Sequence, residues 1–265
     1  MDESNLTRKK DFLTKILSPF KLEILEVLRS RPRTLSELTK ITGKSKQVLL
    51  FHLRPLIRVG LVRKIVVNRR TFYQVTELGA VMCEYILKFL KLKDILVNAG
   101  EFFRDHDVSS IPLSVINDIH MLNGCRILVK NNPYDLHDEW LNILEKSTWV
   151  YGLSSVFHSN FPELFTNLAK ERKVEIILTE NVFNLIVRKY REKLSEYLKY
   201  GKMYVCGNVR LTFIVAEKGF TMNLYRLDGT YDSTRLLVCK TDEGVKWGLK
   251  LFDYYRSKSK VISID

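Results

Sequence analysis

The chain has 265 residues and a formal net charge of +13 at pH 7, from 43 Lys and Arg against 30 Asp and Glu. Its hydrophobic content of 46% is ordinary for a globular protein, and its length suits two modest domains. No run of about 18 apolar residues is present, so no membrane span is expected, and the charged segment 1–13 lacks an apolar signal core, which predicts a cytoplasmic location.

The positive charge is concentrated at the start of the chain. Residues 1–75 hold 17 Lys and Arg against 6 Asp and Glu, whereas the remaining 190 residues hold 26 against 24. A surface that is merely solvated would show an even spread of charge. The local excess instead favours a polyanionic partner, because clustered positive charge steers association with a polyanion and releases its counterions.

Three helices are predicted within the first 60 residues. The first begins after Ser18 and ends at residues 31–33, Arg-Pro-Arg. Thr34 followed by Glu37 predicts a capping box at the start of the second helix. Gly43 supplies a positive φ for the turn that follows, and Ser45 caps the third helix. The apolar face of this third helix consists of Leu49, Leu53, Leu56 and Ile57.

The opposite face of the third helix carries side chains suited to a DNA groove. Gln47 can pair with adenine, Arg54 with guanine or phosphate, and Phe51 can contact a thymine methyl group. Cations at the helix start and in the following hairpin are placed for phosphates. The predicted DNA contacts are Lys44, Ser45, Lys46, Gln47, Phe51, Arg54, Arg69 and Arg70. Pro55 predicts a kink that makes Arg58 a doubtful contact, since proline removes a helical hydrogen bond.

A β-hairpin is predicted after Gly60. Residues 61–67 and 71–75 are β-rich, and Asn68-Arg69-Arg70 forms the tip between them. The run LSELTKITGKSKQVLLFHLRPLIRVGLV, followed by YQVTELG, resembles the winged helix-turn-helix regulators of the ArsR and MarR type. The resemblance implies a domain that binds double-stranded DNA with a recognition helix and a wing.

A long helix is predicted from Thr76 to about Phe103, with a broad apolar face. Such a helix after a wing commonly pairs with its copy in a second subunit, although packing on its own domain is the alternative. We expect a homodimer, because a single winged helix covers little DNA and palindromic sites need two.

The second half of the chain alternates β-rich runs with helical patterns after a polar linker at residues 105–112. The predicted strands are 125–129, 148–156, 175–179, 203–206, 211–216, 220–225 and 236–239. The predicted helices are 136–146, 161–171, 182–200 and 243–257. The early alternation favours βαβ units, and the closely spaced later strands favour an antiparallel edge.

The sequence gives no sign of a metal, a cofactor or catalysis. Cys83, Cys125, Cys206 and Cys239 lie far apart, without metal-ligand spacing, and are expected to be buried thiols in a reducing compartment. Residues 152–156, GLSSV, lack the second glycine of a nucleophile elbow, and no phosphate-binding loop occurs. We therefore expect that the protein is not an enzyme.

The second half also resembles a known family. The runs YGLSSVFHSNFPELFTNLAKERKVEIILTENVF, KYREKLSEYL, MYVC, YDSTRLLVCK and WGLKLFDYYR look like the middle domain of the archaeal methanogenesis regulatory proteins. The resemblance covers roughly residues 111–256 and implies an archaeal transcription regulator with an N-terminal winged helix. It implies an architecture and a role, and it names no ligand.

Polar side chains follow two of the predicted strands in this half. If these strands are parallel neighbours, the side chains open at the same sheet edge, where α/β proteins usually bind ligands. Ordinary capping of the following helices is the alternative. The predicted ligand-binding residues are Ser154, Ser155, His158, Thr179, Glu180 and Asn181, with Tyr231 and Asp232 in a loop that can close the site.

The expected architecture is an α+β winged helix domain at residues 1–75, a long dimerisation helix and linker at 76–110, and a mixed α/β regulatory domain at 111–265. The expected function is a sequence-specific DNA-binding transcription regulator whose second domain senses a small-molecule effector or other signal. The alternatives are a second domain that docks proteins and, less favoured, an enzyme fused to a DNA-binding domain. RNA binding is disfavoured, since no exposed aromatic platform is evident.

Overall fold

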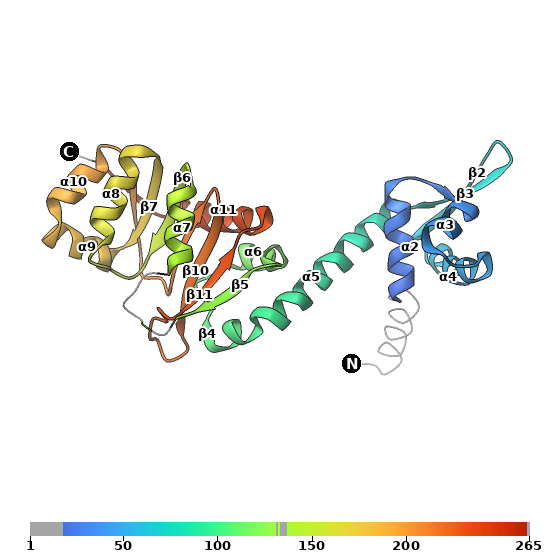
Figure 1. The fold of residues 1–265 in the computed structure, drawn as a ribbon, viewed down its shortest axis with the longest axis horizontal. Coiled ribbons are helices and arrows are strands. Elements are labelled where there is room, and N and C mark those ends of the chain that lie inside the picture. Colours follow the sequence, from blue (N-terminus) through green and yellow to red (C-terminus); the bar gives the residue numbers. More distant parts are fainter. Residues whose placement is uncertain (1–17, 131, 133–136, 264–265) are drawn as a thin grey trace. The chain divides into compact units, whose positions relative to one another are not determined.

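The computed structural model describes residues 18–130, 132 and 137–263 (Figure 1). Two compact units divide the chain, Met1–Leu90 and Lys91–Asp265. The division falls inside one helix, α5 (Glu77–Asp105), rather than at the expected positions after 75 and after 110. The cytoplasmic location was predicted from residues 1–13, which lie outside the described residues. None of the described helices is long and apolar enough to cross a membrane.

The N-terminal unit contains the three predicted helices, α2 (Pro19–Ser30), α3 (Leu35–Thr42) and α4 (Lys46–Arg58). Their ends are set by local signals. The Thr34 side chain accepts the Glu37 backbone N–H while the Glu37 carboxylate accepts the Thr34 N–H, so the capping box is confirmed. Gly43 has a φ of 69°, and the Ser45 hydroxyl accepts the Val48 N–H at 3.3 Å.

The wing is an antiparallel hairpin of β2 (Val62–Val67) and β3 (Arg70–Val75), and the short β1 (Arg33–Thr34) adds to β3. Asn68 and Arg69 at its tip have φ values of 48° and 62°. Positive φ values at both central residues are typical of a two-residue hairpin turn, whose backbone twist matches the right-handed twist of the flanking strands. Arg70, expected at the tip, is the first residue of β3.

The proline in α4 does not end the helix. Pro55 lies inside α4, which continues to Arg58, and the carbonyl of Pro55 accepts the Val59 N–H at 3.1 Å. The three helices and the wing close over one apolar core. Its fully buried members include Ile24, Leu25, Leu28, Leu38, Leu49, Leu53 and Leu56.

The C-terminal unit is built on a mixed sheet (Figure 1). Its described strands run in the order β12-β8-β7-β6-β9-β10-β11-β5, and β4 pairs separately with β10. Their bounds are β4 (His106–Asp107), β5 (Arg126–Val129), β6 (Trp149–Ser154), β7 (Lys173–Thr179), β8 (Lys202–Cys206), β9 (Leu211–Ala216), β10 (Gly219–Arg226), β11 (Arg235–Cys239) and β12 (Lys260–Ile262).

The sheet has a parallel part and an antiparallel part. β6, β7 and β8 are parallel neighbours, as the alternation of strands and helices predicts. β9, β10, β11 and β5 follow as an antiparallel series that joins the parallel part at β6. The expected antiparallel edge is therefore confirmed, and the carboxyl ends of β6 and β7 meet at one edge of the sheet.

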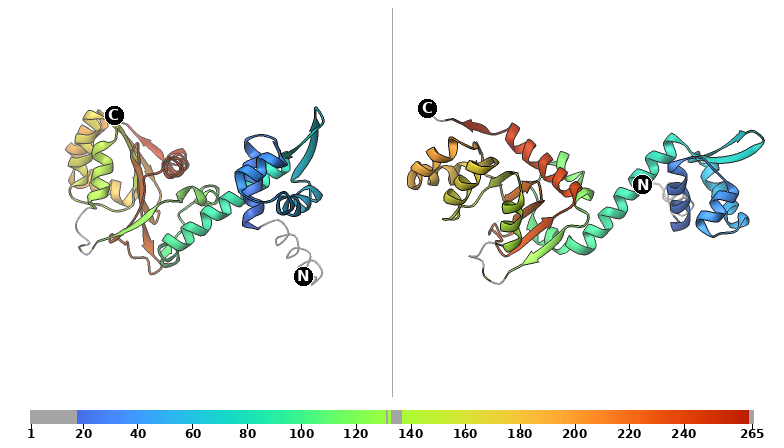
Figure 2. Two further views of the ribbon diagram at one scale, coloured as in Figure 1. Left: turned by 45° about the vertical axis from the view of Figure 1, so that its right-hand side comes forward. Right: turned by 45° about the horizontal axis from the view of Figure 1, so that its top comes forward.

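Helices cover both faces of the sheet (Figure 2). One face packs against α7 (Asp138–Lys146), α8 (Phe161–Glu171), α9 (Glu180–Lys189) and α10 (Arg191–Leu198). The other face packs against α11 (Asp242–Ser257), the short α6 (Leu113–Ile116), the 3-10 turn η1 (Ile119–Leu122) and the end of α5. Each face has its own apolar core.

Three expected elements differ from the structure. The helix expected at 182–200 is two helices, α9 and α10, because the backbone at Tyr190 leaves the helical region with φ −135° and ψ 34°. The linker expected at 105–112 contains β4, whose residues His106 and Asp107 pair with β10. The helix expected from Leu136 begins at Asp138 among the described residues, and Leu136 itself lies outside them.

The cysteines are not all free thiols. Cys125 and Cys239 form a disulfide that joins the start of β5 to the end of β11, so the expectation of four buried thiols is wrong for this pair. Their Cα atoms lie 4.3 Å apart across the sheet core. Cys83 and Cys206 are free and buried, and burial raises the pKa of the Cys206 thiol to about 11. Cys206 is therefore protonated near neutral pH and is a poor nucleophile.

Candidate nucleic-acid interface and ligand cavity

The outer face of α4 exposes the predicted base-reading residues. Leu49, Leu53 and Leu56 are fully buried and fix the helix to its core. Gln47, Phe51 and Arg54 are exposed on the other side, and 72% of Phe51 is accessible. A large aromatic side chain left this exposed on a helix that has a complete apolar core elsewhere is suited to contact a partner.

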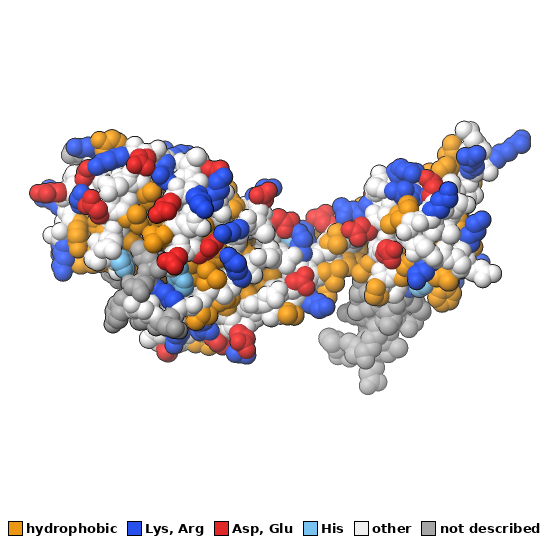
Figure 3. All heavy atoms as spheres, in the orientation of Figure 1, with side chains coloured by type: hydrophobic (Ala, Val, Ile, Leu, Met, Phe, Trp, Pro, Cys, Tyr) orange, Lys and Arg blue, Asp and Glu red, His pale blue; other side chains and the backbone are white. Residues whose placement is uncertain are grey.

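Cations flank this face at the helix start and at the wing. Lys44 and Lys46 are exposed beside the N-terminus of α4, and Arg69 and Arg70 are exposed at the tip of the hairpin. Lys and Arg side chains extend from this hairpin in the space-filling view (Figure 3). The predicted contact Ser45 has a structural task as well, because its hydroxyl caps α4.

His52 is half-buried on the side of α4 that faces α2. Its ring contacts Phe20 and Phe51 edge to face, with centroids 5.0 Å and 5.2 Å away. Burial, together with the nearby Lys21 charge, lowers the pKa of His52 below its usual value. A neutral imidazole at this position supports the packing of α4 on α2 rather than a contact with phosphate.

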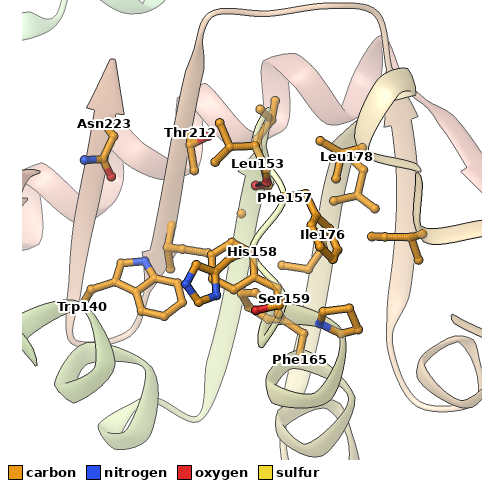
Figure 4. Close-up of a pocket in the computed structure, with 18 of the residues that line it drawn as sticks. Trp140, Leu153, Phe157, His158, Ser159, Phe165, Ile176, Leu178, Thr212 and Asn223 are labelled. Carbon is orange, nitrogen blue, oxygen red and sulfur yellow. Dashed lines mark hydrogen bonds between the residues drawn. The ribbon is translucent and has the colours of Figure 1, made fainter. Parts of the chain in front are cut away.

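A cavity of about 650 Å³ lies in the C-terminal unit, between the sheet and the α7–α10 face. Its wall on the helix side is aromatic, with Trp140 of α7 and Phe161 and Phe165 of α8 in contact with one another. Figure 4 shows Trp140, His158 and Phe165 on this side, with Thr212 and Asn223 on neighbouring strands opposite. The cavity therefore has an apolar wall and a smaller polar one.

Three of the predicted ligand-binding residues line the cavity, namely Ser154, His158 and Tyr231. The Ser154 hydroxyl donates to the Val156 carbonyl at 2.7 Å, and the His158 ring lies 5.1 Å from the Phe161 ring. These residues come from the end of β6, the loop after it and the β10–β11 connection, so distant parts of the sequence meet here.

The other five predicted residues do not line the cavity. The Ser155 hydroxyl shares a 3.0 Å hydrogen bond with Thr212, Thr179 is buried directly before α9, and Glu180 is exposed. The Asn181 amide donates to the Asn208 side chain at 3.2 Å. Asp232 is buried in a cluster of ion pairs with other charged side chains.

Sequence patterns missed most of the cavity lining. The aromatic residues of α7 and α8 repeat at ordinary helical spacing, which indicates a face that packs but not one that encloses a hollow. Asn223 was missed because it lies within β10, away from any strand end. Among the described residues, no group of three or more His, Cys, Asp or Glu side chains is placed to hold a metal ion.

Two protein families match the chain. Residues 18–64 match the arsR family of bacterial regulatory proteins, and residues 133–258 match the middle domain of the methanogenesis regulatory protein FilR1. The chain is 24% identical over 270 residues to methanogenesis regulatory protein FilR1 of Methanothrix harundinacea (strain 6Ac), a match that covers 98% of this chain and 59% of that protein. The chain thus spans about three fifths of the length of this relative.

Similar solved structures include winged-helix proteins. TrmBL2, an archaeal chromatin protein, is 16% identical over 90% of this chain and 91% of its own, with a TM-score of 0.44. A structure described as a putative MarR-family transcriptional regulator from Enterococcus faecalis V583 is 22% identical over 39% of this chain and 94% of its own, with a TM-score of 0.32. HlyU from Vibrio cholerae N16961 is 25% identical over 33% of this chain and 97% of its own, with a TM-score of 0.29.

The fold is a winged-helix domain followed by a mixed α/β domain, and each part matches the model of a family of regulatory proteins. The chain is similar in its N-terminal part to the ArsR-type helix-turn-helix and in its C-terminal part to the FilR1 middle domain, and over 98% of its length to methanogenesis regulatory protein FilR1. Both matched families and the relative are described as regulatory proteins.

Proposed function

We propose that the protein is a sequence-specific DNA-binding transcription regulator whose C-terminal domain binds a small-molecule effector. The observation that carries the DNA-binding part is the outer face of α4, where Gln47, Phe51 and Arg54 are exposed on a helix anchored by a buried leucine face. An amide, an aromatic ring and a guanidinium on one helix face are groups that contact base edges in the major groove.

Base contacts and phosphate contacts have different expected consequences when removed. Arg54→Ala is expected to cost about 1–3 kcal/mol on the preferred sequence and to relax the preference at one base position, because Arg54 reads a base edge. Arg69→Ala is expected to weaken all sequences alike, since the wing grips phosphate. The measurement is the affinity of each variant for a duplex selected from a random pool and for its single-base variants.

The exposed Arg188 of α9, replaced by Ala, is the matched control for loss of one positive charge. It should bind like the wild type. The division of roles is wrong if Arg54→Ala and Arg69→Ala change affinity in parallel across all sequences.

The protein acts as a homodimer in this proposal. The part of α5 in the N-terminal unit exposes a stripe of large apolar side chains at helical spacing, namely Leu78, Val81, Tyr85 and Phe89. Tyr85 and Phe89 are 67% and 68% exposed. Paired copies of this stripe would remove it from water, and two recognition helices would then read two half-sites.

Phe89→Glu is expected to convert the dimer to a monomer, because a carboxylate buried in an apolar interface has no partner there. Sedimentation velocity of the full chain measures this directly. Glu84→Gln, which changes the charge at another position of the same helix, should leave the dimer intact. A wild type that sediments as a monomer at all concentrations contradicts the pairing of α5.

The cavity carries the effector part of the proposal. Its volume of about 650 Å³ lies within the range of roughly 300–1,000 Å³ found for small-molecule pockets, and such pockets are mostly apolar with a few placed polar groups. A domain that only docks proteins requires an apolar patch on its surface and does not require an internal cavity. The hollow between β6–β9 and α7–α10 therefore supports a sensor over a docking module.

Filling the cavity is expected to abolish its binding capacity. Leu194 of α10 lines the cavity and is only partly buried, so Leu194→Trp places an indole in the hollow with little strain. Fluorescence titration with the dye anilinonaphthalenesulfonate should show saturable binding to the wild type and at least about tenfold weaker binding to the variant. Leu90→Trp, at an exposed site on α5, should bind the dye like the wild type. Equal binding by all three proteins contradicts the cavity as the binding site.

A further inference from the structure

The loop between β10 and β11, residues 227–234, connects the cavity to the end of α5. Tyr231 and Ser233 line the cavity. Asp232 between them is 1% exposed, and its backbone N–H donates to the Leu224 carbonyl of β10 at 3.1 Å. The side chains of three consecutive residues are thus divided between the cavity and the interior behind it.

The Asp232 carboxylate is the centre of a buried charge cluster. Its Oδ2 accepts from Arg235 Nε at 2.8 Å, His106 Nε2 at 3.1 Å and Arg226 Nε at 3.3 Å. Its Oδ1 accepts from the Thr234 backbone N–H and hydroxyl. Burial opposes ionisation, but the hydrogen bonds from Thr234 and Arg235 outweigh it and hold the pKa of Asp232 below its usual value. The carboxylate is therefore charged and locked in place.

Two of these partners reach α5. Arg235 uses Nη1 to bind the carboxylate of Asp105, the last residue of α5, at 3.1 Å. His106 follows directly and donates from Nδ1 to the Phe102 carbonyl of α5 at 2.6 Å. His106 also pairs with Arg226 in the β4–β10 ladder. The Asp232 carboxylate thus binds Arg235, which pairs with Asp105 at the end of α5. It also binds His106 of β4, the strand that directly follows α5.

Strand β10 and the loop that follows it both contribute residues to the cavity lining. Asn223 of β10 donates its two amide N–H groups to the carbonyls of Asp232 at 3.2 Å and Arg235 at 2.8 Å. This fixes the orientation of the amide, so its Oδ1 is the acceptor that Asn223 offers to a ligand (Figure 4). Tyr231 and Ser233 of the loop also line the cavity.

The lining also restricts the charge of the ligand. Among the described lining residues the ionisable groups are Lys130, Lys193, His137, His158 and two tyrosines, and none is Asp or Glu. Lys193 already pairs with Glu163 and Glu196. A cationic ligand would find no carboxylate among the described lining residues, whereas an uncharged or anionic polar group would not be repelled there. Opposite the polar wall lie the aromatic side chains of α7 and α8.

We propose that the cavity binds an amphipathic molecule whose polar end, uncharged or anionic, contacts the 227–234 loop, and that Asp232 and Arg235 transmit its binding to the end of α5. The proposal rests on the effector-binding function proposed above and adds the class of ligand and the route of the signal. The physical reason is that a ligand whose polar end is held by Tyr231 and Ser233, and by Asn223 Oδ1 where that end carries an O–H or N–H donor, restrains the loop whose Asp232 positions the Arg235–Asp105 ion pair.

Hydrogen–deuterium exchange of the full chain tests the route, with anilinonaphthalenesulfonate as the probe. The dye should slow exchange several-fold at the end of α5, around residues 99–105, in the wild type. Arg235→Gln and Asp105→Ala both break the Arg235–Asp105 pair, and each should bind the dye with unchanged affinity but lose the slowing. Arg226→Gln removes a different cation from the same carboxylate without touching α5, and it should keep the slowing.

The outcomes separate the route from the cavity itself. Dye that binds the wild type and Leu194→Trp equally contradicts the effector site. If the dye binds in the cavity but slows hydrogen exchange at the end of α5 equally in wild type, Arg235→Gln and Asp105→Ala, the proposed route is wrong. For the ligand class, decanoate and decanol should displace the dye, and decyltrimethylammonium of the same chain length should be at least about tenfold weaker, since the described lining offers no carboxylate. Equal displacement by the cation overturns the class.

Discussion

Trp247→Ala is expected to lower the free energy of unfolding of the C-terminal domain by about 3–5 kcal/mol, the usual cost of removing a fully buried Trp side chain. The Trp247 ring has no exposed surface, packs edge to face on Phe220 with centroids 5.4 Å apart, and donates from Nε1 to the Val115 carbonyl at 3.0 Å. The substitution leaves a cavity between α11 and the sheet and removes the indole hydrogen bond to the Val115 carbonyl, which keeps its bond from the Asp118 N–H at 3.0 Å.

The effect should be confined to one domain, because the apolar core around Trp247 contains only residues of the C-terminal unit. All three tryptophans, Trp140, Trp149 and Trp247, lie in that unit. Urea unfolding followed by tryptophan fluorescence therefore reports on that domain alone. Trp149→Ala, which removes a partly exposed ring, is the matched control and should cost less.

Hydrogen exchange in α2–α4 should be unchanged by Trp247→Ala. A Trp247→Ala variant with an unaltered urea midpoint contradicts the central place of this ring in the core. A variant that also destabilises α2–α4 contradicts the independence of the two cores.

The winged helix was predictable because its signals are local. The capping box at Thr34 and Glu37, the left-handed Gly43 and the Leu49–Leu53–Leu56 spacing each act within a few residues. The same holds for the strands predicted in the second domain, whose bounds agree with the β-rich runs within two residues, whereas β4 and β12 were not predicted. Local pattern fixes where an element lies and which face it buries.

Strand order and the lining of the cavity depend on contacts that are distant in sequence. β5 pairs with β11 through Leu236 and Leu128, more than a hundred residues apart, and no local pattern specifies that pairing. The break at Tyr190 has no Gly or Pro to mark it. The Cys125–Cys239 bond follows from the β5–β11 pairing and was missed for the same reason.

The candidate ligand site was predictable only in part. Ser154 and His158 were found because polar residues after a buried strand lie at the sheet edge. Asp232 was predicted to close the site, but it follows Tyr231 in a loop where alternate side chains face different directions, and Arg235 and His106 draw it inward. Which polar residue lines a hollow and which one braces the loop behind it depends on tertiary contacts.

The affinity for DNA is expected to fall by about four orders of magnitude when monovalent salt is raised from about 50 mM to about 200 mM. Lys44, Lys46, Arg69 and Arg70 are exposed around α4 and the wing, so the proposed dimer would present about eight phosphate contacts. Each neutralised phosphate contributes about −0.9 to the slope of log affinity against log salt, which predicts a slope of about −7. Arg69→Ala removes about two contacts per dimer and should reduce the slope by about 2.

The salt dependence of affinity for a duplex selected from a random pool, measured for the full chain and for Arg69→Ala and Arg188→Ala, is the most direct test of DNA binding by the winged helix. The account predicts a steep slope of about −7 for the wild type, a shallower slope for Arg69→Ala and an unchanged slope for Arg188→Ala, because Arg69 is placed against phosphate and Arg188 is not. A slope near zero, or equal slopes for wild type and Arg69→Ala, would contradict it.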